Sequence, residues 1–239
     1  CASNWRHKPV DWQTMAFTRT EMVLLDVDGT LVDTVPDLAY SVDTMLQEIG
    51  LPQRGEDKIR NWVGNGIETL VKRALTDDDD GEPDTALFEH AFPLFMDIYA
   101  DNAARHSRFY PGVEDGMHYL KSAGYKLGCV TNKRTRFTEI LLQTLGIYDD
   151  FGIVICGDTL PRRKPDPLPL LHAAEYFSVS PAVSLMVGDS INDVGAARAA
   201  GFNILCVSYG YNRGMDINAA NPDAVVDSLA ELPRHLQAS

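Results

Sequence analysis

Positive charge is scarce in this sequence. Its 239 residues include 21 Lys and Arg against 34 Asp and Glu, which gives a formal net charge of -13. Nucleic acids and anionic membrane surfaces are bound through clustered Lys and Arg, so the composition argues against both as partners. An acidic chain that binds an anion must also provide a local cation, and we look for one below.

Long apolar runs and cysteine clusters are also absent. No stretch approaches the roughly 20 apolar residues of a transmembrane helix, and residues 1–19 lack the apolar centre of a signal peptide. Cys129, Cys156 and Cys206 lie in apolar runs typical of buried free thiols, without metal-ligand spacing. We therefore expect a protein of the reducing cytoplasm, and we take Cys1 to mark a trimmed start because nothing else indicates export.

Short apolar runs alternate with helical patterns. The runs that predict buried strands are residues 23–27, 126–130, 153–155, 183–187 and 203–207. The helical patterns that separate several of them are residues 112–123, 136–145, 168–177 and 193–200. This alternation predicts an α/β fold with a doubly wound, Rossmann-like parallel sheet, whose ligands bind beyond the carboxyl ends of the strands.

Residues 36–110 have a different pattern, with successive helices and no convincing buried strand. Ile67, Leu70 and Val71, for example, share one face at helical spacing. We expect a small all-helical cap domain here, inserted after the first strand. The predicted α/β core comprises residues 1–35 and 111–239, of which 1–20 could be a poorly ordered extension.

Two carboxylates follow the first predicted strand. Asp26 and Asp28 are two residues apart, and Gly29 permits a tight turn. In extended geometry the two side chains share one side, where one can attack an electrophile and the other can handle a proton. An acidic turn without chemistry explains the pair equally well, whereas an EF-hand fits poorly because Gly29 comes too early.

Groups that could bind an anion lie farther along the chain. Thr131 and Asn132 end the second predicted strand, where a hydroxyl and a backbone N–H can hold phosphate oxygens. Such residues also end strands for turn chemistry alone. Lys164 can supply the required fixed cation, although Arg162 and Arg163 are candidates for the same role.

Two further carboxylates, Asp189 and Asp193, follow the strand at 183–187 and can share the start of one helix. Either one could be no more than a helix cap. Together with Asp26 and Asp28 they form an oxygen-rich set that suits magnesium better than zinc, because no His or Cys joins them.

Charge counting favours a metal at this set. With Asp28 protonated, Asp26, Asp189 and Asp193 carry three negative charges, and a phosphate monoester adds about two. Each close like-charge pair costs roughly 4 kcal/mol at 4 Å and an effective dielectric near 20. One Mg²⁺ together with Lys164 cancels three of the five charges, so the sequence predicts a magnesium cofactor.

These motifs occur in an order and context that resemble the haloacid dehalogenase-like hydrolase superfamily. The likeness extends over the chain from about Met22, and the predicted helical insert is similar to the helical cap of that superfamily. Within the insert, residues 62–75 resemble the cap of bacterial phosphoglycolate phosphatases. The motifs are Asp26-Val27-Asp28-Gly29-Thr30-Leu31, Thr131-Asn132, Lys164-Pro165, and Gly188-Asp189 with Asp193.

The resemblance implies roles for five residues of the first three motifs. Asp26 would be the nucleophile, Asp28 the general acid and base, and Lys164 a charge-balancing group beside Asp26. Thr131 and Asn132 would hold the phosphate. The implied reaction is hydrolysis of a small phosphate ester, 2-phosphoglycolate, to glycolate and phosphate through an aspartyl-phosphate intermediate.

For the metal, the resemblance implies that Mg²⁺ binds Asp26, the backbone carbonyl of Asp28, and Asp189. Asp193 would contact the residues that bind the metal and hold them in place, without binding the metal itself.

The carboxylate of 2-phosphoglycolate needs a partner of its own. Backbone N–H groups from Gly64, Asn65 and Gly66 could contact it from the cap, with Arg73 or Lys72 nearby. A Gly-Asn-Gly segment before a helix can also be a simple turn, and the two basic residues can be an exposed helix face.

Other functions remain open at this point. A sugar-phosphate phosphatase or a phosphomutase of the same superfamily would use the same Asp26 and Asp28, whereas a haloacid dehalogenase would not need Asp28. A phosphate-ester-binding protein without turnover is the alternative from a different class. The oligomeric state does not follow from the sequence.

Overall fold

The computed structural model describes residues 17–212 and 214–237. Of the expected N-terminal extension, only residues 17–20 fall within this range, and Phe17 is buried and bridges Leu236. Residues 1–16, including Cys1, lie outside the described residues. In the described part of the chain, no helix is both long and apolar enough to cross a membrane.

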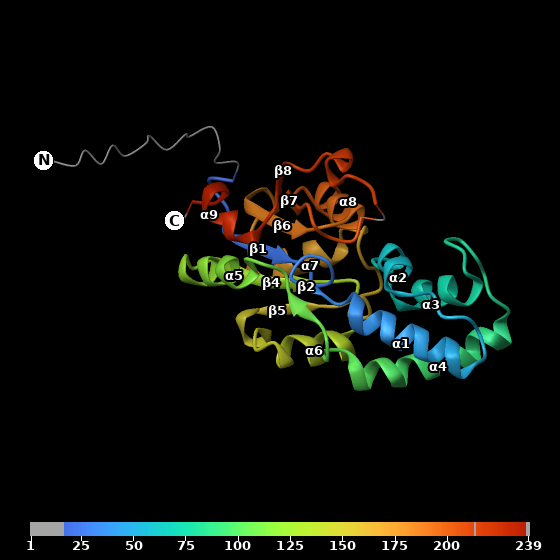
Figure 1. Cartoon of the computed structure of the whole chain (residues 1–239). Helices are drawn as coiled ribbons and strands as arrows, with labels where there is room; N and C mark the ends of the chain where they lie inside the picture. Colours follow the sequence, from blue (N-terminus) through green and yellow to red (C-terminus); the bar gives the residue numbers. More distant parts are fainter. Residues whose placement is uncertain (1–16, 213, 238–239) are drawn as a thin grey trace, which may run out of the picture.

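A six-stranded sheet, ordered β5-β4-β1-β6-β7-β8, forms the centre of the molecule (Figure 1). Every neighbouring pair in it is parallel, which confirms the predicted doubly wound α/β fold. The strands are β1 (Met22–Leu25), β4 (Lys126–Val130), β5 (Ile153–Ile155), β6 (Ser184–Gly188), β7 (Asn203–Val207) and β8 (Ala224–Val226).

Helices cover both faces of this sheet. One face packs on α5 (Val113–Ser122), α6 (Thr135–Thr144) and α9 (Leu232–His235), and the other packs on α7 (Leu168–Phe177) and α8 (Ile191–Ala200). The side chains of β1 alternate accordingly. Val23 and Leu25 belong to the first cluster and Met22 and Leu24 to the second, and all are fully buried. Burial on both faces explains why these strands appear in the sequence as unbroken apolar runs.

Short 3-10 helices connect the larger elements of the core. They are η2 (Tyr148–Asp150), η3 (Pro181–Val183), η4 (Ile217–Ala220) and η5 (Leu229–Glu231).

Four helices lie in the region predicted as a cap, and we call them the cap helices: α1 (Val35–Glu48), α2 (Glu56–Trp62), α3 (Ile67–Thr76) and α4 (Thr85–Asn102). They enclose a hydrophobic cluster of their own, which Phe137 and Tyr211 join from the sheet-containing part. Figure 1 shows them beside one end of the sheet, next to the loop that leaves β1. They therefore adjoin the edge at which ligands of parallel sheets bind.

Two chain segments connect the cap helices to the rest of the molecule, and they are joined to each other. β2 (Val32–Asp33) pairs antiparallel with β3 (Arg108–Phe109). The buried Asp37 carboxylate, in the first turn of α1, accepts hydrogen bonds from the His106 and Ser107 backbone N–H groups at 2.8 Å each. The entry and exit of the cap are thus held as one unit.

Candidate active site

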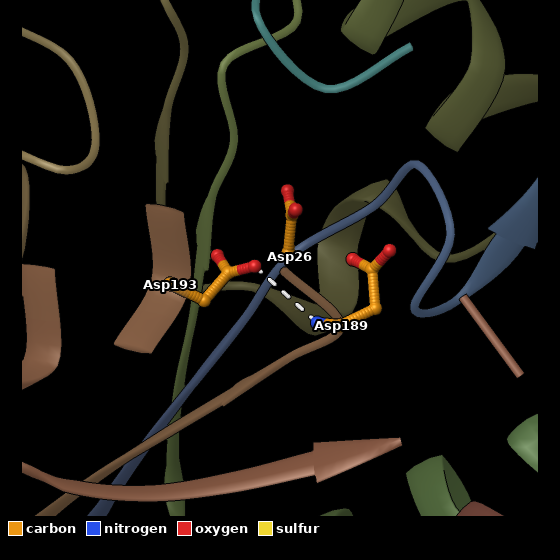
Figure 2. Close-up of side chains that lie close together, drawn as sticks. All are labelled: Asp26, Asp189 and Asp193. Carbon is orange, nitrogen blue, oxygen red and sulfur yellow. Dashed lines mark hydrogen bonds between the residues drawn. The ribbon is translucent and has the colours of Figure 1, made fainter. Parts of the chain in front are cut away.

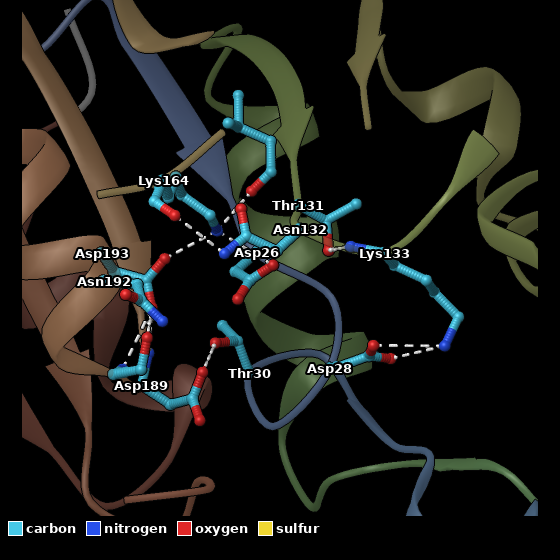
Figure 3. A network of polar contacts seen from close by, with 12 residues as sticks. Asp26, Asp28, Thr30, Thr131, Asn132, Lys133, Lys164, Asp189, Asn192 and Asp193 are labelled. Atoms are coloured by element: carbon cyan, nitrogen blue, oxygen red, sulfur yellow. Dashed lines mark hydrogen bonds and ion pairs between the residues drawn. The ribbon is translucent and has the colours of Figure 1, made fainter. Parts of the chain in front are cut away.

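Residues that follow β1, β4 and β6 meet at one end of the sheet (Figure 3). Together with residues of the cap helices they line one cavity of about 40 Å³. The core contributes most of the polar lining, and the cap contributes apolar side chains and two glycines. The lining residues are Asp26, Asp28, Leu38, Val63, Gly64, Gly66, Ile67, Leu70, Thr131, Asn132, Lys133, Lys164, Asp189, Ser190, Asn192 and Tyr211. We call this cavity the central pocket.

Asp26 and Asp28 lie on the turn that follows β1. The Asp26 N–H still bonds to the Val187 carbonyl at 3.0 Å, as if the strand continued, and the chain then turns with Gly29 at φ 86°. This positive φ explains the glycine, and a Cβ there would also collide with Asp189. Both carboxylates line the central pocket, so the structure brings the predicted pair together.

Lys164 is buried at the bottom of the site. Its Nζ lies 3.0 Å from Asp26 Oδ1 and 2.7 Å from Asp193 Oδ1, and it donates to the Val130 carbonyl at 2.7 Å. Burial works to lower the pKa of this lysine, but the charges of Asp193 and Asp26 outweigh it and raise the pKa. Lys164 is therefore a permanent cation beside Asp26. Arg162, by contrast, pairs with Asp166 at the surface.

Three buried carboxylates, those of Asp26, Asp189 and Asp193, offer oxygens that all lie within 4.8 Å of one another (Figure 2). Burial raises the pKa of Asp26 to about 6, with Asp193 and Asp28 adding to the effect and Lys164 opposing it. Burial and the charges of Asp193 and Asp26 also raise the pKa of Asp189 well above its usual value. One lysine does not neutralise this group.

Asp193 differs from Asp189 because one of its oxygens pairs directly with the buried ammonium of Lys164. Oδ1 faces Lys164, while Oδ2 accepts from the Ser190 hydroxyl at 2.6 Å and the Ser190 N–H at 3.0 Å, closing a capping box at the start of α8. Figure 2 also shows its contact with the Asp189 N–H at 3.3 Å. Asp193 thus holds Lys164 and the loop carrying Asp189 in place.

The remaining carboxylates fit a magnesium ion. Asp26 Oδ1 is buried and lies 3.0 Å from Lys164 Nζ, and among the described residues it has no other polar partner. Asp189 is oriented by the Thr30 hydroxyl at 2.9 Å and the Tyr211 N–H at 2.6 Å. A Cβ at Gly210 would collide with Asp189, so glycine there leaves room for this carboxylate. Hard oxygen donors of this kind suit Mg²⁺.

Thr131 and Asn132 lie at the end of β4, as predicted, and both line the central pocket. The Thr131 hydroxyl accepts from the Lys133 N–H at 3.3 Å, and the Asn132 amide nitrogen donates to the Lys164 carbonyl at 3.0 Å. Both side chains are thus fixed next to Asp26.

The cap loop formed by Gly64, Asn65 and Gly66 contacts the core directly. Gly64 and Gly66 have φ values of 115° and 88° and line the central pocket. The Asn192 amide nitrogen donates to the Gly64 carbonyl at 3.2 Å and to Asn65 Oδ1 at 3.1 Å. The loop therefore borders the pocket, with Gly64 and Gly66 in its lining and Asn65 in the adjoining cavities.

Arg73 lies elsewhere. Its guanidinium is buried within the cap, where it donates to the Trp62 and Asp79 carbonyls at 2.8 Å each. It follows the first residue of α3 by six positions, about 9 Å along the axis, so closeness to Gly66 in sequence does not bring it to the pocket.

Lys133, which its sequence context alone does not mark as a site residue, also lines the pocket. Its Nζ lies 3.0 and 3.1 Å from the two oxygens of Asp28 (Figure 3). It also donates to the Tyr99 hydroxyl of α4 at 2.6 Å. Burial works to lower the pKa of Lys133, but the Asp28 charge and these hydrogen bonds raise it overall. The available signal was its position directly after Thr131 and Asn132 at a strand end.

Tyr211, which was also missed, connects the site to the cap. Its N–H bonds to Asp189, and its hydroxyl donates to Asp33 Oδ1 at 2.6 Å and accepts from the Thr34 N–H at 2.8 Å. Arg60 of α2 binds the same Asp33 carboxylate at 3.0 and 3.1 Å. Arg60, Asp33, Thr34 and Tyr211 thus form one polar network between the site and the cap helices.

The fold and this arrangement at the strand ends define a class. The chain belongs to the haloacid dehalogenase-like hydrolase family, whose model matches residues 23–207.

Within that family, the chain is 58% identical to the phosphoglycolate phosphatase of Nitrosococcus oceani, an alignment that covers 89% of this chain and 94% of the relative. It is 49% identical to the phosphoglycolate phosphatase of Thiobacillus denitrificans, covering 87% and 92%. The crystal structure of a predicted phosphoglycolate phosphatase from Haemophilus somnus superimposes with a TM-score of 0.85 at 35% identity, covering 90% of this chain and 97% of the other.

Proposed function

We propose that this protein is a magnesium-dependent phosphatase that hydrolyses 2-phosphoglycolate to glycolate and phosphate. The observation that carries the proposal is the buried Asp26 oxygen, paired with Lys164 and facing a pocket that also contains a second carboxylate, Asp28. The two relatives at 58% and 49% identity support the choice of substrate.

In the first step, a carboxylate oxygen of Asp26 attacks phosphorus while the ester P–O bond breaks. Asp28 gives a proton to the departing glycolate oxygen, because an alkoxide is a poor leaving group without one. Thr131 and Asn132 orient the phosphoryl group. The product of this step is an aspartyl-phosphate at Asp26 and free glycolate.

In the second step, water attacks phosphorus and Asp28 takes its proton. The bond between phosphorus and the Asp26 oxygen breaks, which restores the carboxylate and releases inorganic phosphate. Because the transferred group makes few covalent demands, positioning and charge neutralisation provide most of the rate.

Asp26, the Asp28 carbonyl and Asp189 are the groups that would hold Mg²⁺. When bound, the ion supplies the positive charge that the phosphate and the buried carboxylates require. Lys164 supplies the fixed part of that charge, and Asp193 keeps Lys164 pointed at Asp26.

The size of the central pocket favours a compact leaving group. Its volume of about 40 Å³ has room for roughly three water molecules, so we expect the cap helices to move when an ester enters. We propose that residues 36–110 act as a cap domain in this sense, which the separate hydrophobic cluster of the cap helices supports. Glycolate then fits beneath the closed cap more readily than a sugar.

The net charge of -13 supports a small-molecule substrate rather than nucleic acid or a membrane surface. The buried free thiols of Cys129, Cys156 and Cys206 support a reducing cytoplasm as its compartment.

Phosphate release from a panel of monoesters, with magnesium and with a chelator, tests the proposal. We expect magnesium-dependent turnover with the highest kcat/KM on 2-phosphoglycolate. Highest activity on sugar phosphates would contradict the choice of 2-phosphoglycolate as the substrate and favour a sugar-phosphate phosphatase. Transfer between positions of a sugar phosphate without phosphate release would favour a phosphomutase, and tight ester binding without any product would favour a binding protein.

Magnesium should also stabilise the folded protein. At 100 times the dissociation constant, the free energy of unfolding should rise by about 2.7 kcal/mol. Because folding raises the Asp26 pKa from 3.8 to about 6, the metal-free folded state binds more protons than the unfolded chain between these values, and this group stabilises it as the pH falls through that window. Magnesium must displace that proton, so its increment should be smaller at pH 5 than at pH 7.5.

Urea unfolding with and without magnesium, at both pH values, measures the increment. Asp189→Asn serves as the comparison and should lose most of the increment at pH 7.5. An increment that is equal at the two pH values, or equal in Asp189→Asn, would contradict the assignment of these carboxylates to the ion.

A further inference from the structure

The central pocket holds two lysines on opposite sides of Asp26 and Asp28. Among the described residues that line it, Lys133 and Lys164 are the cations. Lys164 is engaged at the bottom by Asp26, Asp193 and the Val130 carbonyl. Lys133 faces Asp28, with its side chain only 1% exposed. The two lysines can therefore contact different parts of a ligand bound in the central pocket.

A substrate with two anionic groups needs a second cation, and the other basic residues nearby have different partners. Arg73 binds carbonyls inside the cap, Lys72 pairs with Glu82 at 2.6 Å, and Arg134 pairs with Glu68. Arg163 lies against Gly66 and lines the adjoining cavities on the outer side. Lys133 is the cation that the central pocket offers to a second anion.

The position of Lys133 matches the dimensions of the substrate. Asp28 must reach the ester oxygen to protonate it. The carboxylate carbon of glycolate is two bonds from that oxygen, a separation of about 2.5 Å. A cation 3.0 Å from Asp28 is therefore within hydrogen-bonding reach of the carboxylate of a substrate whose ester oxygen contacts Asp28.

We propose that Lys133 recognises the carboxylate of the substrate and so determines specificity for phosphate esters of small hydroxy acids. This inference rests on the proposed function, because it places the leaving group of that reaction. Lys133 then discriminates 2-phosphoglycolate from phosphate esters of similar size that lack a carboxylate, because it forms a charge-assisted hydrogen bond to that carboxylate.

Tyr99 links this recognition to the cap. It lies on α4, accepts a hydrogen bond from Lys133, and holds the ammonium 5.1 Å from its ring centre. Leu38, Val63 and Leu70 add apolar lining from the cap side. With the cap in this position, little water competes for Lys133, which strengthens its attraction for an anion.

Three esters separate the roles that Lys133 can have. 2-Phosphoglycolate has a carboxylate and a poor leaving group, ethyl phosphate has only the poor leaving group, and p-nitrophenyl phosphate has neither feature. For Lys133→Met we expect kcat/KM on 2-phosphoglycolate to fall by roughly 10- to 100-fold, the effect of one charge-assisted hydrogen bond. The other two esters should change by less than about threefold.

Two other patterns would overturn the proposal. A loss shared by 2-phosphoglycolate and ethyl phosphate, with p-nitrophenyl phosphate spared, would mean that Lys133 acts only by positioning Asp28. An equal loss on all three esters would mean a structural role. Failure of the proposed function is separate, because it would appear in the unmutated protein as no preference for 2-phosphoglycolate over ethyl phosphate.

Lys126→Met is the matched control, since Lys126 is an exposed lysine at the opposite end of β4 and should leave all three rates unchanged. If Lys133→Met does not fold, judged by circular dichroism, Lys133→Arg decides the question. Moving the charge without removing it should change the ratio of 2-phosphoglycolate to ethyl phosphate by at least about threefold. An unchanged ratio would contradict the contact.

Discussion

Replacing Asp26 by asparagine should abolish phosphate release, with a loss of about 10⁴-fold or more in kcat. The amide has nearly the same shape as the carboxylate, but it is not a nucleophile and cannot form the aspartyl-phosphate. Release of inorganic phosphate from 2-phosphoglycolate under saturating magnesium measures the effect. Full activity in Asp26→Asn would place the nucleophile elsewhere and remove the basis of the proposed mechanism.

The same variant should fold normally, which separates loss of chemistry from loss of structure. Burial raises the Asp26 pKa to about 6, so the folded protein already disfavours the charge at this position. A neutral amide should leave the melting temperature unchanged or raise it. Asp115→Asn, the same substitution on the exposed side of α5, provides the control and should keep full activity.

Replacing Lys164 by methionine should have the largest effect on stability. Lys164 is buried between Asp26 and Asp193, and its removal leaves two carboxylates without their cation. Breaking a buried ion pair on one side costs about 3–5 kcal/mol. Urea unfolding in the presence of a chelator should show a loss of this size, and activity should fall as well because Asp26 loses its charge-balancing partner.

A second substitution distinguishes lost charge balance from lost packing. Adding Asp193→Asn to Lys164→Met removes one of the uncompensated charges and should recover part of the stability, which a double-mutant cycle quantifies. Lys121→Met, which breaks a surface pair with Asp150, should cost no more than about 1 kcal/mol. Equal losses for Lys164→Met and Lys121→Met would contradict the buried-charge argument.

Much of the sheet was predictable because its strands are buried on both faces. The predicted runs at 126–130, 153–155 and 203–207 coincide with β4, β5 and β7. β8 was missed because it has only three residues and pairs with β7 alone at the edge of the sheet. The start of α8 was placed too late, although the Ser190–Asp193 capping box is visible in the sequence.

In the cap, α2 was missed because seven residues give too little helical periodicity to read. Its buried residues, Ile59 and Trp62, become core positions only through packing against the neighbouring helices.

The polar residues at strand ends were predictable for a geometric reason. Parallel strands bring their carboxyl ends to one edge, so Asp26, Thr131 and Asp189 had to approach one another. Contacts across the cap followed no such rule. Tyr211 bonds to Asp33 across 178 positions, and Lys133 meets Tyr99 only because α4 packs against the segment that follows β4, where Tyr99 also contacts Phe137. Tertiary packing, not local pattern, made these residues part of the site.

Tyr211 has a consequence for how the site and the cap influence each other. One residue donates to Asp189 through its backbone and contacts Asp33 and Thr34 through its hydroxyl. Under the proposed cap motion, a group that binds at Asp189 and favours one orientation of this residue would also favour one position of the cap helices. Linkage would make the effect reciprocal, so the factor by which closure tightens binding at Asp189 would be the factor by which that binding favours closure.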